Sequence, residues 1–66
     1  MKITYTVNCD GKTEGYPSLL GADDHASTAA KSEAIQNVFI TEHSTKRIMV
    51  FKENGEKLIK PEIRKA

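Results

Sequence analysis

The sequence predicts an α+β fold in which one amphipathic helix packs on a small antiparallel sheet, in the order strand, strand, helix, strand, strand. Three observations lead to this prediction. The first residues alternate between apolar and polar side chains, a central segment repeats its apolar residues with helical period, and an Asn-Gly pair separates two apolar runs near the end. A chain of 66 residues is the size of one small domain, so residues 1–66 are treated as a single unit.

The first predicted strand is Lys2–Asn8, where Ile3, Tyr5 and Val7 fall on one face and polar residues fall on the other. The strand is rich in β-branched and aromatic residues, which favour a half-buried strand. Asp10-Gly11 follows it and is typical of a tight turn.

The returning strand is predicted at Thr13–Tyr16, and Pro17 stops it. This segment is short and contains a glycine, so the sequence leaves open whether it forms a strand. Ser18–His25 is predicted to be a connector in which Leu19 and Leu20 are tucked under the sheet or the start of the helix.

The helix is predicted at Ser27–Phe39. Its apolar residues recur at helical spacing and form one stripe, which consists of Ala30, Ala34, Val38, Ile35 and Phe39. Ser27 or Thr28 can cap the first turn. Alanines allow a helix to approach a sheet closely, so we expect the alanine-rich turns to lie nearest the strands.

The second half of the chain is predicted to form a hairpin after a polar loop at Thr41–Lys46. Its strands are Arg47–Lys52 and Glu56–Lys60, joined by the Asn-Gly turn. Pro61 is expected to end the last strand, leaving Glu62–Ala66 as a polar tail.

The register of this hairpin has two alternatives. A two-residue loop places Glu53 opposite Glu56 and Lys52 opposite Lys57, and like charges opposite one another are unfavourable. A three-residue loop with Gly55 in the left-handed region places Lys52 opposite Glu56. The second register is the one we predict.

The strand Arg47–Lys52 is apolar on both faces, because Ile48 and Val50 point one way while Met49 and Phe51 point the other. One helix covers one face only. Some of Met49, Phe51 and Ile59 are therefore expected to face the tail, the Leu-Leu connector, a second copy of the chain or a foreign partner.

Charge is unevenly distributed along the chain, although the net charge is only +1. Residues 1–43 hold three basic and six acidic residues, whereas residues 44–66 hold seven basic and three acidic residues. The basic hairpin suggests an acidic partner, or a sheet edge protected by lysines. A single cysteine, the lack of a signal-peptide pattern and the lack of a long apolar run predict a cytoplasmic protein that is not in a membrane.

No motif in the sequence points to catalysis. His25, His43 and Cys9 have no metal-ligand spacing, and nothing ties a histidine to a candidate nucleophile. We therefore predict a protein that is not an enzyme, with no catalytic residues, no metal site and no cofactor.

Partner binding is the function class that the residues favour. The predicted contacts are Met49 and Phe51 as apolar anchors, surrounded by Arg47, Lys52, Lys57 and Lys60. A nucleic-acid partner is the alternative, contacted through Lys46, Arg47, Lys52, Lys57 and Lys60, and a dimeric small-ligand-binding (sponge) protein is a third.

The segment Lys52–Lys57, read with the opening Met-Lys strand and the central helix, resembles small type I-F anti-CRISPR proteins of phages. This resemblance implies a phage or mobile-element inhibitor that docks on a host CRISPR surveillance complex and blocks it. Ala30–Ile35 followed by Ile48–Lys57 is similar to a family of short bacterial domains of unknown function. Gly15-Tyr16-Pro17, with the helix after it, more remotely resembles HicB-type antitoxins.

Overall fold

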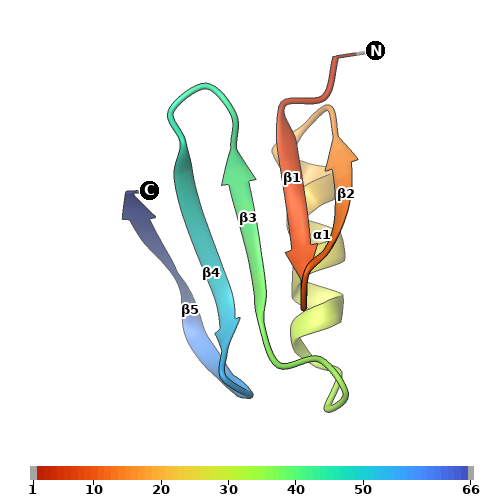
Figure 1. Ribbon diagram of the computed structural model, residues 1–66, viewed down its shortest axis with the longest axis vertical. Coiled ribbons are helices and arrows are strands. Elements are labelled where there is room, and N and C mark those ends of the chain that lie inside the picture. Colours follow the sequence, from red (N-terminus) through yellow and green to blue (C-terminus); the bar gives the residue numbers. More distant parts are fainter. Residues whose placement is uncertain (1, 66) are drawn as a thin grey trace.

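The computed structural model describes residues 2–65 and consists of one helix on one face of a five-stranded antiparallel sheet (Figure 1). The strands are ordered β2-β1-β3-β4-β5 across the sheet. The elements are β1 (Tyr5–Cys9), β2 (Lys12–Tyr16), α1 (Leu19–Ala30), β3 (Val38–Glu42), β4 (Arg47–Glu53) and β5 (Glu56–Lys65). The predicted α+β class is confirmed, with five strands instead of about four.

The first hairpin joins β1 and β2, so the uncertain second strand does form. Its register runs from Tyr5 opposite Tyr16 to Cys9 opposite Lys12. Asp10 and Gly11 form the two-residue turn with φ values of 52° and 89°, which is the conformation that a tight antiparallel hairpin requires. The first strand was predicted to begin at Lys2, but β1 begins at Tyr5.

The predicted position of the helix is wrong. α1 occupies Leu19–Ala30, and most of this segment was predicted to be a connector. Only Ser27–Ala30 is shared with the predicted helix Ser27–Phe39. The sequence pattern did not reveal this helix because the buried side chains of α1 are all alanines, namely Ala22, Ala26, Ala29 and Ala30. Alanine spacing gives a weak hydrophobic signal, and packing on the sheet overrides the low helix propensity of the glycine, aspartates and histidine in this segment.

β3 is the strand that the sequence analysis missed, because Val38 and Phe39 were assigned to the end of the helix. β3 pairs with β1 on one side and with β4 on the other, so it is the central strand of the sheet. Val38 and Ile40 point to the helix side and are at most 2% exposed, while Phe39 lies on the other face. The run of β-branched and aromatic residues in the segment Val38–Glu42 is the signal that could have located it.

The predicted three-residue loop between β4 and β5 is also wrong. Glu53 lies opposite Glu56 and Lys52 lies opposite Lys57, and Asn54 and Gly55 have positive φ values of 51° and 83°. The like-charge pairs are tolerated because two of these charges interact elsewhere. Lys52 Nζ donates to the Ser32 carbonyl at 2.7 Å, and Glu53 accepts two hydrogen bonds from Arg64.

β5 continues through Pro61, which was expected to end it. Pro61 is tolerated because β5 is an edge strand with a wide bulge. Between the pairs Val50–Glu62 and Lys52–Lys57, only Phe51 of β4 lies opposite the four residues Leu58–Pro61 of β5. The predicted polar tail is therefore largely a strand, although Ala66 lies outside the described residues.

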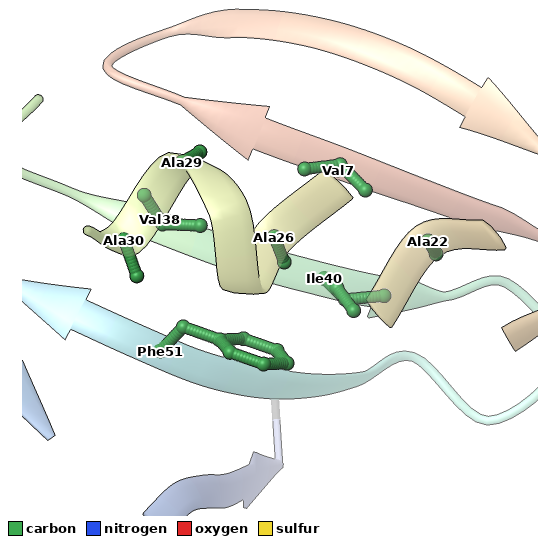
Figure 2. Close-up of a cluster of buried hydrophobic side chains, with 8 residues drawn as sticks. All are labelled: Val7, Ala22, Ala26, Ala29, Ala30, Val38, Ile40 and Phe51. Atoms are coloured by element: carbon green, nitrogen blue, oxygen red, sulfur yellow. The ribbon is translucent and has the colours of Figure 1, made fainter. Parts of the chain in front are cut away.

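The core lies between α1 and the sheet (Figure 2). Its buried side chains are Val7, Ala22, Ala26, Ala29, Ala30, Val38, Ile40 and Phe51. Because the helix contributes only methyl groups, it lies close to the strands, as expected for alanine-rich turns. Gly21 continues this close approach toward β2, since a Cβ there would lie 3.0 Å from a ring carbon of Tyr16.

The segment between α1 and β3 connects the two hairpin turns at one end of the sheet. The Asp10 carboxylate accepts hydrogen bonds from the backbone N–H groups of Gln36 and Asn37, and these bonds hold its pKa below the usual value. On the other side, Gly55 N–H donates to the Gln36 carbonyl at 2.8 Å. No helix among residues 2–65 has the length and hydropathy needed to cross a bilayer.

Candidate partner-binding groove

A single helix is too narrow to cover five strands, and α1 is placed off-centre. It packs on β1 to β4, most extensively on β1 and β3. In Figure 1 it lies behind β1 and β2, whereas most of β4 and β5 lies clear of it. The helix side of β4 and β5 is therefore incompletely covered, and two adjoining hollows open there between α1 and β5.

The first hollow has a volume of about 140 Å³ and lies beside the start of α1. It is lined by Tyr5, Leu19, Ile40, Glu42, Arg47, Ile48, Met49 and Ile63. The second has a volume of about 400 Å³ and lies beside the rest of α1. It is lined by Asp23, Ser27, Lys31, Phe51, Lys57, Leu58, Ile59 and Pro61. Met49 and Phe51 are two residues apart on the same face of β4, so the two hollows follow one another along this strand, and their lining residues together define the α1–β5 groove.

The wall of the groove on α1 follows from helical periodicity. Leu19, Asp23 and Ser27 are spaced by four residues, so they lie on one side of the helix, next to the alanine stripe. Leu19 is 39% exposed, and Leu20 in the same turn is 81% exposed. Both leucines were predicted to be tucked under the sheet or the start of the helix, and this prediction is wrong, because both are exposed.

The wall on β5 is created by the bulge. Ile59, within the bulge, is 98% exposed, and Ile63, which lies opposite Met49 on β4, is 55% exposed. Large apolar side chains on both walls are thus accessible. Ile59 is one of the residues that the sequence predicted to face the tail, the Leu-Leu connector, a second copy or a partner, whereas Leu19 and Ile63 were not predicted as partner-binding residues.

The floor of the groove contains the two residues predicted as apolar anchors. Phe51 is only 6% exposed, and Figure 2 shows its ring beside α1 among the core residues. The prediction that Phe51 is an exposed anchor is therefore wrong, because strand alternation places it on the same face of β4 as Met49, where α1 covers it. Met49 is half-buried and packs against the same core from the other hollow.

The predicted cations are not brought together into one patch. Lys52 is buried at 6% exposure and donates to Ser32, so it is not available as a rim charge. Lys46 and Arg47 are exposed at the start of β4, and Lys57 and Lys60 are exposed on β5. Among residues 2–65, no ion pair involves these four exposed cations.

A charged network lies across part of the opposite face of the sheet. Phe39, Ile48 and Val50 lie on this face, where Arg64 and Glu53 border a shallow hollow over them. Arg64 Nη1 and Nη2 donate to Glu53 at 2.6 and 3.0 Å, and Nε donates to Glu62 at 3.0 Å. The paired guanidinium lowers the pKa of Glu53, and Val50 is only 6% exposed. The face of β4 away from α1 is therefore that of Ile48 and Val50, not that of Met49 and Phe51 as the sequence suggested, and the network covers it only in part.

The remaining polar contacts around the histidines and Cys9 lie outside the groove. Tyr16 Oη lies 2.8 Å from His25 Nδ1, and Thr6 Oγ1 lies 2.6 Å from His43 Nε2. Burial, followed by nearby carboxylates, raises the pKa of Cys9, which disfavours the reactive thiolate. Within residues 2–65, no three histidine, cysteine or acidic side chains converge on one point.

No protein-family model, no curated protein and no solved structure matches the chain. The three family resemblances noted in the sequence therefore remain predictions.

Proposed function

We propose that this chain is a non-enzymatic binding module that docks on an acidic protein surface through the α1–β5 groove. The observation that carries this proposal is the juxtaposition of exposed apolar side chains on both groove walls with cations on β4 and β5 that form no ion pair within residues 2–65.

The apolar part of the groove favours a macromolecular partner. Leu19, Ile59 and Ile63 are exposed to water on the two walls, and Met49 lies between them on the floor. Burying such surface contributes about 25 cal/mol per Å² of apolar area. Exposed apolar side chains gathered along a hollow are typical of a protein interaction site.

The charges favour an acidic partner. On β4 and β5, the Arg64 guanidinium is paired and Lys52 is buried, which leaves Arg47, Lys57, Lys60 and Lys65 facing solvent. Of the three glutamates on these strands, Glu53 and Glu62 are paired with Arg64, so only Glu56 offsets these exposed cations. This excess of positive charge attracts carboxylates and raises the association rate with an acidic surface.

We propose first that the docked chain blocks a host macromolecular complex. It is the activity implied by the resemblance to small phage anti-CRISPR proteins. A 66-residue chain with an open groove has enough surface to cover a functional site on a larger complex, since a standard interface buries only about 800 Å² per partner.

The experiment is to immobilise the full chain, expose it to bacterial lysate, identify the captured proteins by mass spectrometry, and titrate each purified protein by calorimetry. We expect a purified acidic protein whose affinity falls at least about tenfold for Ile59→Asp, because truncating a central interface contact has effects of this size. Ile3→Asp is the matched control, since Ile3 is exposed outside the groove, and it should leave the affinity unchanged.

Thermal unfolding of both variants checks that each remains folded. The proposal is wrong if no purified protein binds in a manner that depends on Ile59. It is also wrong if the captured material is nucleic acid whose binding falls steeply between low and moderate salt, which is the signature of phosphate contacts.

A further inference from the structure

We infer that the part of the partner that occupies the α1–β5 groove is an amphipathic α-helix with carboxylates along the flank that faces β5. The inference rests on the proposed function, because it names the element that docks in the same groove.

The dimensions of the uncovered region match one helix. Neighbouring strands are about 4.8 Å apart, so β5 and the part of β4 that α1 leaves uncovered present a strip at most about 10 Å wide, which leaves room for one helix and no more. The groove runs beside α1 from Leu19 to Lys31, and the 12 residues of α1 span about 18 Å. A partner helix of roughly three turns would therefore complete the layer that α1 leaves unfinished.

A partner strand fits this site poorly. A strand would have to pair with the outer edge of β5, but this edge carries the bulge at Leu58–Pro61. Proline lacks a backbone N–H, and Lys57 and Lys60 flank the bulge. Bulges, prolines and lysines are the features by which edge strands avoid further pairing.

A second copy of this chain also fits poorly. The helix that it could offer is α1, whose large apolar residues are only Leu19 and Leu20. An occupying helix needs apolar residues at i, i+3 or i+4, and i+7 to follow the groove. α1 uses its other apolar positions, all alanines, to pack on its own sheet.

The charges of the two walls set the orientation of the partner. On the α1 wall, Asp23 and Lys31 balance each other, whereas Lys57 lines the β5 wall and Lys60 lies close to it in sequence. Glu42 lies near Arg47 in the first hollow and accepts hydrogen bonds from Tyr5 and Thr45. Carboxylates are therefore favoured on the flank facing β5, mainly toward Lys57.

The test uses three synthetic peptides of about 14 residues, each titrated into the full ¹⁵N-labelled chain and followed by two-dimensional NMR. The first is a Leu-striped helix with Glu on one flank. The second carries Lys in place of Glu, and the third has the composition of the first with a central Pro that prevents a continuous helix.

We expect the Glu-flanked helix to bind at least about tenfold more tightly than either control, a difference that chemical-shift titration resolves readily. The shifted amide signals should belong to Leu19, Asp23, Ile59 and Ile63. Ile59→Asp should weaken this binding, and Ile3→Asp should not. Lys57→Glu combined with Lys60→Glu should reverse the preference so that the Lys-flanked helix binds more tightly.

The outcomes separate the inference from the proposed function. If the Pro-containing peptide binds the same groove as tightly as the helix, the partner element is not a helix, and docking in the groove is still supported. If no peptide shifts the groove signals while a captured acidic protein does, only the helix inference is overturned. If every shift maps to the opposite sheet face, both are overturned.

Discussion

At the scale of single residues, side chains that look alike in the sequence have different roles in the structure. Met49 and Phe51 are alternate apolar residues on β4, yet Phe51 is a core residue and Met49 is half-buried in the groove. Lys52 and Lys57 lie opposite each other, yet one is buried and hydrogen-bonded while the other is exposed. These differences depend on what lies above each side chain, since α1 covers Phe51 whereas Met49 borders the first hollow, and Lys52 reaches the Ser32 carbonyl whereas Lys57 faces solvent.

Replacing Phe51 tests its assignment to the core. Phe51→Ala should lower the free energy of unfolding by about 3–5 kcal/mol, because it removes buried apolar surface and leaves a cavity beside α1. The measurement is urea denaturation followed by circular dichroism. Phe51→Leu is the matched control and should lose clearly less. An alanine variant as stable as the parent would show that this ring is not in the core.

Asp10 is predicted to make stability depend on pH in the acid range. Hydrogen bonds from Gln36 and Asn37 lower the pKa of Asp10 in the folded state, so the unfolded state binds more protons as the pH falls. Asp10 therefore makes its full contribution to the free energy of unfolding above about pH 4, the approximate pKa of an aspartate in the unfolded chain. This contribution is lost as the pH falls through the lower pKa of the folded state.

The matched variant is Asp10→Asn, which keeps a residue that tolerates the positive φ but removes the charge. It should be less stable than the parent at pH 7, and the difference should shrink toward pH 2. Thermal unfolding measured between pH 2 and 7 checks this. A constant difference over this range would contradict the predicted role of the carboxylate.

At the scale of elements, the packing of α1 depends on small side chains and not on large ones. Four alanines form its buried face, and three core residues of β1 and β3, Val7, Val38 and Ile40, fill the space below them (Figure 2). This geometry explains both the closeness of the helix to the sheet and the failure of the sequence pattern to identify it.

Enlarging the buried face of α1 should destabilise the protein. Ala26 is 0% exposed, so Ala26→Leu forces added methyl groups into a packed layer and should lower the free energy of unfolding by about 1–3 kcal/mol. Thr28→Leu is the matched control on the exposed side of the helix and should change stability by less than about 0.5 kcal/mol. Equal effects of the two substitutions in urea denaturation would show that α1 does not lie close to the sheet.

At the scale of the whole molecule, the two sides of the sheet differ in kind. One face is crossed by the Glu53–Arg64–Glu62 network over Val50, and the other carries α1 and the open groove beside it. Charge is divided differently, between the two edges of the sheet. Glu14, Asp23 and Asp24 lie on β2 and α1, whereas Arg47, Lys57, Lys60 and Lys65 lie on β4 and β5. The capture and peptide experiments above test whether this asymmetry serves partner binding.

The sequence by itself determined the features that depend on local periodicity and turn chemistry. Alternation identified the first strand, the apolar run beside the Asn-Gly pair identified β4, the Asp-Gly and Asn-Gly pairs identified both turns, and the apolar faces of β4 showed that one helix could not cover the sheet. These features are readable because each depends on residues within a few positions of one another.

Only the tertiary structure decided which segment is the helix, where the central strand lies, and which side chains border the groove. The Ala22–Ala30 stripe becomes a core face only when Val7 and Ile40 lie beneath it, and the two-residue register is stabilised by contacts of Lys52 with Ser32 and Glu53 with Arg64. These contacts join residues 11 to 20 positions apart or lie between different elements. These contacts stabilise the protein only after the chain has folded, so a pattern of neighbouring residues in the sequence could not predict them.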